Sequence, residues 1–282
     1  MTAITATLVN GEPGELIPVS DRGLLYGDGV FETIVVREGC PQHWQRHMNR
    51  LQAGCTRLGI QPFESAQLAA EADSIIKGAD TGVLKLIVTR GSGGRGYRVA
   101  ETTVSTRIMQ LHPWPEYPAD CAEQGVKTRL CETRLGQNAD LAGIKHLNRL
   151  EQVLARQEWI DDDIREGLLM DADGNLVEGT MSNLFIISDG VLMTPDLSRC
   201  GVAGIMRTII LELAEQQGLD TRITQISRQA LLQADEVFLS NSLIGIWPVV
   251  AVGNSMYRKG AITVQLQKLL ADTSDNNPGW RQ

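Results

Sequence analysis

Cysteine is scarce in this sequence, and the few cysteines present are scattered. All five stand singly, without a Cys-x-x-Cys pair and without a His/Cys cluster at the spacing of zinc ligands. The odd number, and an N-terminus ("MTAITATLVNGEPGE") with no signal-peptide pattern, favour free thiols in a reducing compartment. We therefore expect no disulfide framework, no metal site and a cytoplasmic location.

The sequence also lacks long apolar runs and an excess of positive charge. No stretch approaches the roughly 20 consecutive apolar residues of a membrane-spanning helix. The net charge of −8 disfavours nucleic acid or an anionic membrane as the main partner, because both bind basic surfaces. A small anionic ligand held by a few arginines remains compatible with this charge.

Lysine is used sparingly, with only six in 282 residues. One of them, Lys145, stands in "LAGIKHLNRLEQVLAR" (141–156), after a small-residue turn and before an amphipathic pattern that predicts a helix from Leu147. A functional lysine must reach its amine form, and the positive end of such a helix would favour that form. By position alone, an ordinary surface lysine is the more common case.

The chain is long enough for one large domain or two medium ones. Three prolines in "HPWPEYPAD" cannot continue a helix or a central strand, so we expect a linker at 112–120. It would separate an N-terminal domain, 1–111, from a C-terminal domain, 121–282. Helical and strand patterns mix without a strict βαβ repeat, which predicts an α+β fold in two domains.

Local patterns predict individual elements. A hairpin is expected at "NGEPGE" and another around Asp173-Gly174, and "DTSDNNPGWRQ" (272–282) reads as a loose tail. We further expect strands at 29–39, 82–91, 102–113 and 125–132, helices at 42–58 and 64–77, a helix following "GVAGI", and a strand–loop–strand unit over 234–253.

Two segments suggest chemistry. In "GVAGIMR" (201–207), glycines lead into a helix start whose free N–H groups could hold an anion, although a plain glycine-rich loop has the same composition. In "VEGTMSN" (177–183), Glu178 stands near a strand end. If buried, it would need a partner that stabilises its charge; an exposed glutamate is the simpler interpretation.

Two arginine-bearing segments are less specific. "RGSGGRGY" (90–97) lacks the spacing of a dinucleotide-binding loop and joins two predicted strands. A mobile lid, a carboxylate clamp through Arg90 and Arg95, or a plain surface loop would all suit it. On the helix at 42–58, Arg50 lies opposite the apolar stripe, and periodicity alone places it on a solvated face.

An amine, a phosphate-binding helix start and a carboxylate are the three groups that pyridoxal phosphate requires. The aldehyde forms an imine with lysine, the phosphate binds N–H groups, and the pyridine nitrogen binds an acid. The sequence therefore suggests the hypothesis that Lys145 tethers this cofactor.

The ordered motifs "SDRGLLYGDGVFETI", "HMNRL", "IKHLNRLEQ", "VEGTMSNLF", "GVAGIMR" and "ADEVFLSNS" resemble those of the fold-type IV pyridoxal-phosphate enzymes. This superfamily includes branched-chain and D-amino acid aminotransferases and 4-amino-4-deoxychorismate lyases. The matches run from about residue 19 to 249. "LKLIVTRGSGGRGY" and "LAGIKHLNRLEQVLAR" look most similar to the lyases, which make 4-aminobenzoate and pyruvate in folate biosynthesis.

The resemblance implies roles that composition and spacing do not show. It implies a homodimer in which Lys145 is the catalytic Schiff-base lysine and Thr33 helps to deliver a proton. The remaining implied ligands are Glu178 for the pyridine nitrogen, Arg50 and the N–H groups of Ile205 and Met206 for the phosphate, Asn241 or Ser242 as its third ligand, and Arg90, Arg107 and Arg95 for substrate carboxylates.

Two other functions stay open at this point. An aminotransferase on the same fold would share the tethered cofactor and differ only in its substrate contacts. A non-catalytic anion-binding module built on the two glycine-rich loops would leave Lys145 and Glu178 unexplained.

Overall fold

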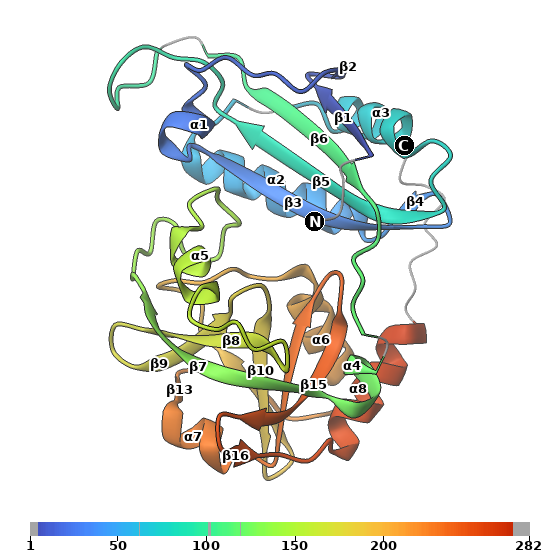
Figure 1. Ribbon diagram of the computed structural model, residues 1–282, viewed down its shortest axis with the longest axis vertical. Helices are drawn as coiled ribbons and strands as arrows, with labels where there is room; N and C mark the ends of the chain where they lie inside the picture. Colours follow the sequence, from blue (N-terminus) through green and yellow to red (C-terminus); the bar gives the residue numbers. More distant parts are fainter. Residues whose placement is uncertain (1–4, 62, 101–102, 119, 273–282) are drawn as a thin grey trace. The chain divides into compact units, whose positions relative to one another are not determined.

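The computed structural model describes residues 5–61, 63–100, 103–118 and 120–272, and these form two compact units (Figure 1). Unit 1 contains the described residues up to Glu116 together with Ile144–Asn148; unit 2 contains Tyr117–Gly143 and the described residues from Arg149 onward. The division falls inside the stretch expected to be a linker. Apart from Asp272, the segment expected to be a loose tail lies outside the described residues.

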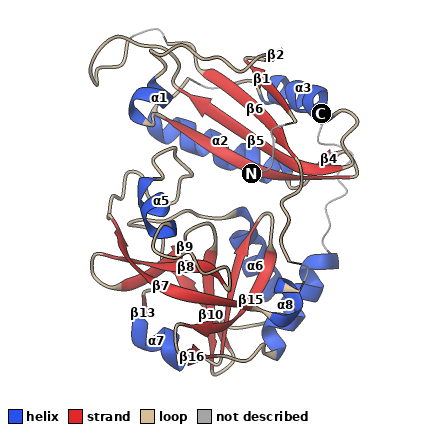
Figure 2. Cartoon of the chain, in the orientation of Figure 1, coloured by secondary structure: helices blue, strands red, loops and turns tan. Residues whose placement is uncertain are grey.

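Each unit combines helices with a sheet, which confirms the α+β class (Figure 2). In unit 1, six strands pair antiparallel in the order β2-β1-β6-β5-β3-β4. The elements of unit 1 are β1 (Ala6–Val9), β2 (Glu12–Pro13), α1 (Arg22–Tyr26), β3 (Gly29–Arg37), β4 (Cys40–Pro41), α2 (Trp44–Leu58), α3 (Ser65–Ile76), β5 (Thr81–Thr89) and β6 (Thr106–His112).

Local chemistry explains the boundaries of these elements. Asn10 and Gly11 both adopt positive φ, 54° and 87°, as the predicted Asn-Gly hairpin between β1 and β2 requires. The apolar stripe of α2 is buried as predicted, with Met48 and Leu51 at most 2% exposed. Gly59 ends α2 in the left-handed conformation, with φ of 66°.

The two faces of the unit 1 sheet differ in character. Apolar side chains of β3 and β5 pack with those of α2 and α3 in one core, which includes Ile34, Leu51 and Leu84. Side chains alternate along a strand, so Phe31 and Thr33 lie on the opposite face of β3. This opposite face carries the polar groups that matter for function.

The helix expected from Leu147 begins only at Leu150, as the seven-residue α5 (Leu150–Arg156). The residues before it pair with an edge of the unit 1 sheet: Phe31 N–H donates to Lys145 O and Leu147 N–H donates to Gly29 O. Backbone groups used in this way cannot form a helical turn. The expectation that a helix start directly behind Lys145 activates the lysine is therefore wrong.

Unit 2 contains a ten-stranded sheet that closes on itself, because β9 pairs with both β8 and β10. Besides α5, its elements are α4 (Cys121–Gln124), β7 (Val126–Leu135), β8 (Ile164–Asp171), β9 (Asn175–Gly179), β10 (Asn183–Ser188), β11 (Val191–Pro195), α6 (Ile205–Gln216), β12 (Thr221–Thr224), β13 (Ile226–Ser227), α7 (Arg228–Gln233), β14 (Glu236–Asn241), β15 (Gly245–Val252), β16 (Ser255–Met256) and α8 (Ala261–Asp272).

The closed sheet has a core on each side. Alternating residues of β10 and β14 divide between them: Leu184 and Leu239 join one cluster, while Phe185 and Phe238 stack at 4.7 Å and pack with α6 and α8. The hairpin predicted at Asp173-Gly174 is confirmed. No helix among the described residues is long and apolar enough to cross a bilayer.

Candidate active site

Lys145 belongs to unit 1, although it follows the first strand of unit 2 in the sequence. Its carbonyl accepts a hydrogen bond of 2.9 Å from the Phe31 N–H, and the next residue, His146, is bridged to Val30. The Nζ lies 4.4 Å from the centroid of the Phe31 ring, within the range of a cation–π contact. Residues 30 and 31 of β3 thus hold both the backbone and the side chain of the lysine.

The structure adds Lys85, which sequence reasoning missed, to the groups near Lys145. Lys85 lies opposite Thr33 in the β3–β5 pair, and its Nζ is 5.9 Å from the same Phe31 ring. Two ammonium groups and the Thr33 hydroxyl therefore share one face of the sheet. The signal was available in "VLKLIV", where one polar residue interrupts an apolar strand and must face away from its apolar neighbours.

Periodicity alone suggested that Arg50 is solvated. In the structure it instead forms a buried pair with Glu32 of β3. Its Nε donates to Glu32 Oε1 at 2.8 Å, and its Nη2 donates to Oε2 at 2.5 Å. The Arg50 side chain is 13% exposed and that of Glu32 only 1%. The other two arginines on this face of α2, Arg46 and Arg57, are both exposed.

His47 completes this buried cluster. Burial lowers the pKa of His47, against the opposing influence of Glu32, and its Nδ1 forms a hydrogen bond of 2.6 Å with Glu32 Oε2. Burial would raise the pKa of Glu32, but the charge and hydrogen bonds of Arg50, with those of His47, lower it to about 2. Glu32 is therefore ionised, with Arg50 as its charge partner.

Arg90 and Arg107, expected to bind substrate carboxylates, are both engaged inside unit 1. Arg90 donates twice to Asp28 and once each to the carbonyls of Leu58 and Gly59, and the residue is only 6% exposed. Arg107 pairs with Glu71. These contacts engage every nitrogen of Arg90 but only Nε and Nη2 of Arg107, and a contact of either arginine with substrate stays a prediction. Arg95 lies exposed in the loop between β5 and β6.

Glu178 is the acid of unit 2, and it is buried rather than exposed, with 4% exposure. Its Oε2 accepts a hydrogen bond of 2.8 Å from the Val202 N–H, and its Oε1 accepts one of 3.4 Å from Gln152 Nε2. Burial lowers the pKa of Arg149, against the influence of the nearby Glu178 and Glu151 carboxylates. Glu178 thus has the donors and the neighbouring cation that favour its charged form.

The segment before α6 is shaped by glycines. Gly201 has a φ of +86°, and a Cβ on Gly204 would collide with the buried amide of Asn183. Gly204 provides no side-chain cap, and the first-turn N–H groups of Ile205 and Met206 have no helical carbonyl to bind. The predicted glycine-led helix start is therefore present in the structure, and anion binding there stays a prediction.

A row of buried polar side chains lies beneath this segment. Glu178 of β9 pairs with Asn183 of β10, and Asn183 pairs with Ser240 of β14. Asn183 donates to the Val202 carbonyl, whereas the buried Ser240 hydroxyl has no hydrogen-bond partner in the described part of the chain. A buried hydroxyl without a protein partner is uncommon and is a feature that a bound polar group would explain.

The third phosphate ligand was left between Asn241 and Ser242. The Asn241 side chain closes its own turn: Oδ1 accepts from the N–H groups of Leu243 and Ile244, and Nδ2 donates to the Met181 carbonyl. These bonds favour Ser242 of the two.

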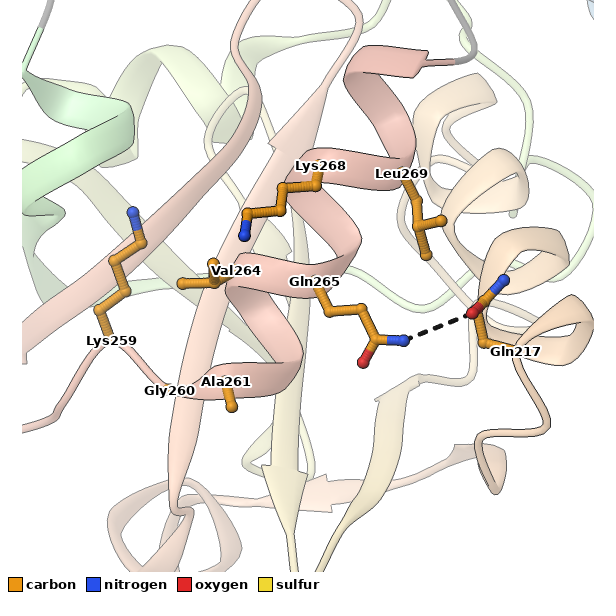
Figure 3. A pocket seen from close by; sticks show the side chains of 8 residues that line it. All are labelled: Gln217, Lys259, Gly260, Ala261, Val264, Gln265, Lys268 and Leu269. Carbon is orange, nitrogen blue, oxygen red and sulfur yellow. Dashed lines mark hydrogen bonds between the residues drawn. The ribbon is translucent and has the colours of Figure 1, made fainter.

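A separate hollow of about 560 Å³ lies along α8, between Lys259, Lys268 and Gln217 (Figure 3). It contains none of the predicted site residues. The N–H groups at the start of α8 are already bound by the carboxylate of Glu236, at Ile262 and Thr263. The hollow therefore offers no helix start for an anion and takes no part in the candidate site.

The residues fit pyridoxal phosphate by their chemistry. Lys145 supplies an amine, Glu178 a buried carboxylate, and the start of α6 uncapped N–H groups above an unpaired hydroxyl. Among the described residues, no group of three histidine, cysteine or acidic side chains could hold a metal ion.

Comparison with known proteins gives an independent view. Residues 29–252 match the family model described as amino-transferase class IV. A protein of Vibrio harveyi named aminodeoxychorismate lyase is 37% identical over 246 residues, covering 86% of this chain and 90% of the relative. The D-alanine aminotransferase of Bacillus licheniformis is 28% identical over 249 residues, covering 87% and 86% of the two chains.

Solved structures agree with these relatives. The 4-amino-4-deoxychorismate lyase of Pseudomonas aeruginosa superimposes with a TM-score of 0.92 at 48% identity, covering 95% of this chain and 99% of its own. The branched-chain aminotransferase of Escherichia coli gives 0.85 at 26% identity, covering 99% and 98%. The expected fold is confirmed over nearly the whole chain.

The structural role of Arg90 leads to a prediction about stability. Arg90→Met should lower the free energy of unfolding by about 2–4 kcal/mol, because it leaves Asp28 short of a partner and two carbonyls unpaired. Urea denaturation would measure the loss. Arg199→Met, which breaks a pair with the half-exposed Asp173, serves as control and should leave the free energy of unfolding nearly unchanged. An Arg90 variant as stable as the wild type would contradict this role.

Proposed function

The chain belongs to the class IV aminotransferase family, and within it we propose a pyridoxal-phosphate-dependent lyase that converts 4-amino-4-deoxychorismate to 4-aminobenzoate and pyruvate, a step of folate biosynthesis. The observation that carries the proposal is the greater similarity to proteins named as this lyase, 37% and 48% identical, than to the two aminotransferases compared, at 28% and 26% over similar lengths. The shared polar face of Lys145, Thr33 and Lys85 supports it.

The residues that the family resemblance implies would hold the cofactor. Lys145 would hold its aldehyde carbon, and the Glu178 carboxylate would hold its ring nitrogen in the protonated form. Pyridoxal phosphate bound in this way supplies an electron sink for charge that develops on the substrate. Its phosphate would be held by Arg50, by the N–H groups of Ile205 and Met206, and by Ser242.

Lys145 also carries the main proton transfer. With substrate bound, the Lys145 Nζ would remove the proton at C4 of the substrate. The enolpyruvyl C–O bond then breaks, which leaves an aromatic ring, and the departing three-carbon group takes up a proton to become pyruvate. We assign the delivery of a proton to the departing group to Thr33.

The substrate is a dianion and needs cations near the reacting carbon. Arg90 and Arg107 already pair with Asp28 and Glu71, so we assign this task first to Lys85, together with Arg95 of the exposed loop. Lys85 is supported by its place across from Thr33 in the sheet. A strand holds a side chain in position better than a loop does, so Lys85 is the stronger of the two assignments.

We propose that the protein is a homodimer. Several apolar side chains are strongly exposed in the isolated chain, among them Leu16 and Val19 before α1, and Tyr97 and Val104 between β5 and β6, all more than 80% exposed. Such exposure of large apolar side chains is typical of surfaces that a partner covers. The family resemblance makes a second copy of the chain the partner of choice.

We further propose the cytoplasm as the compartment. All five cysteines are free, and burial raises the pKa of Cys55 and Cys131 to about 12, so both remain protonated thiols. Unpaired, unreactive cysteines suit a reducing environment.

A product assay tests the activity. Protein loaded with pyridoxal phosphate and mixed with 4-amino-4-deoxychorismate should release 4-aminobenzoate and pyruvate in equal amounts, and Lys145→Ala should release neither. Cofactor-loaded wild type that makes no product, but converts to the pyridoxamine form with amino acids alone, would instead identify an aminotransferase.

The same assay tests Lys85. Lys85→Met keeps the length and apolar stem of the side chain but removes its charge, so KM for the dianion should rise about tenfold or more while cofactor binding is retained. Lys127→Met, at an exposed lysine of unit 2 paired with Asp163, is the control. An unchanged KM would remove Lys85 from the substrate site.

The assembly can be measured directly. Sedimentation equilibrium should give twice the 30.9 kDa of one chain. Leu16→Glu combined with Val104→Glu should shift the protein toward monomer, because burying two carboxylates is costly. A wild-type protein that sediments as a monomer at micromolar concentration would refute the dimer.

A further inference from the structure

The buried cluster of Glu32, His47 and Arg50 has no assigned function beyond the phosphate contact proposed for the arginine. It joins β3 to α2 through one carboxylate that accepts three hydrogen bonds of 2.5–2.8 Å, two from Arg50 and one from His47. The Glu32 and His47 side chains are each 1% exposed.

A contribution to stability does not by itself explain this buried cluster. Around it, Val30, Ile34 and Met48 form an apolar core. A buried ion pair in such surroundings commonly contributes no more than well-packed apolar side chains of the same volume. A buried carboxylate held by two partners therefore points to a task other than stability.

The carboxylate restrains the orientation of the arginine side chain. Glu32 grips the guanidinium through Nε and Nη2, which leaves three of the five N–H donors outside this pair. A planar guanidinium held at two points cannot rotate, so its remaining donors keep a fixed direction. The buried His47 of α2 in turn fixes the position of the Glu32 carboxylate.

The cluster is also tied to the lysine. Glu32 directly follows Phe31, whose N–H binds the Lys145 carbonyl, so neighbouring residues of one strand position the amine and the arginine. The charge of Lys145 also contributes, as the smallest cause, to the lowered pKa of His47.

We propose that Glu32 and His47 are positioning residues for cofactor binding, which hold the Arg50 guanidinium in the orientation that binds the phosphate of pyridoxal phosphate. The inference rests on the proposed function, which assigns the phosphate to Arg50. It adds two residues that touch neither cofactor nor substrate and act only through the arginine.

The chain offers a matched control for a test. Arg107 of β6 and Glu71 of α3 form a second two-point pair between a strand and a helix of unit 1, with side-chain exposures of 12% and 9%. Glu32→Gln and Glu71→Gln therefore make the same chemical change in similar surroundings. Only Glu32 is linked to the proposed phosphate ligand.

The experiment compares binding of pyridoxal phosphate with binding of pyridoxal, which lacks the phosphate, to cofactor-free protein by absorbance titration. Glu32→Gln should weaken binding of pyridoxal phosphate tenfold or more and leave that of pyridoxal within about twofold. His47→Leu should act in the same direction, and it replaces Glu32→Gln if that variant does not fold. Glu71→Gln should change neither affinity.

Three results would overturn the inference: equal loss of both ligands in Glu32→Gln, no loss of either, or the same selective loss in Glu71→Gln. The titration needs no lyase substrate. A failed product assay with wild-type protein would refute the lyase and leave this comparison intact.

Discussion

The hydrogen bond from the Phe31 N–H to the Lys145 carbonyl is the contact on which the proposed chemistry depends. It helps to hold Ile144–Asn148, from the second half of the chain, against the edge of β3. There the Phe31 ring contacts the lysine Nζ. The residues beside Phe31 have separate tasks on the same strand, because Glu32 faces α2 and grips Arg50 while Thr33 lies opposite Lys85. A strand suits this arrangement since its side chains alternate strictly between two faces.

In unit 2, the closed sheet fixes the positions of the polar side chains. The pairing of Glu178 with Asn183 joins β9 to β10, and the pairing of Asn183 with Ser240 continues the row to β14. Val202 then binds both Glu178 and Asn183, through its N–H and its carbonyl. The polar row therefore fixes the glycine segment, and the segment in turn presents the uncapped start of α6. A Cβ at Gly204 would collide with the Asn183 side chain.

Much of this could be predicted from the sequence, and the failures share a physical cause. Periodicity predicted the buried stripe of α2, and the local motif predicted the glycine segment before α6. Spacing cannot show which partner a charged side chain meets. Arg50 looked solvated but is held by Glu32, and the sequence does not show that Asp28 and Glu71 are the partners of Arg90 and Arg107. The late start of α5 has the same origin, since pairing with β3 overrides a helical pattern.

The central claim is that Lys145, and not its neighbour Lys85, is the amine that takes the cofactor. Both ammonium groups lie within 6 Å of the Phe31 ring, at 4.4 and 5.9 Å, so proximity to that ring alone does not separate them. Reduction of the cofactor-loaded protein with borohydride, followed by peptide mapping, would mark the tethered lysine permanently. A single label on Lys145 is the predicted result. A label on Lys85, or on any other lysine, would contradict the account.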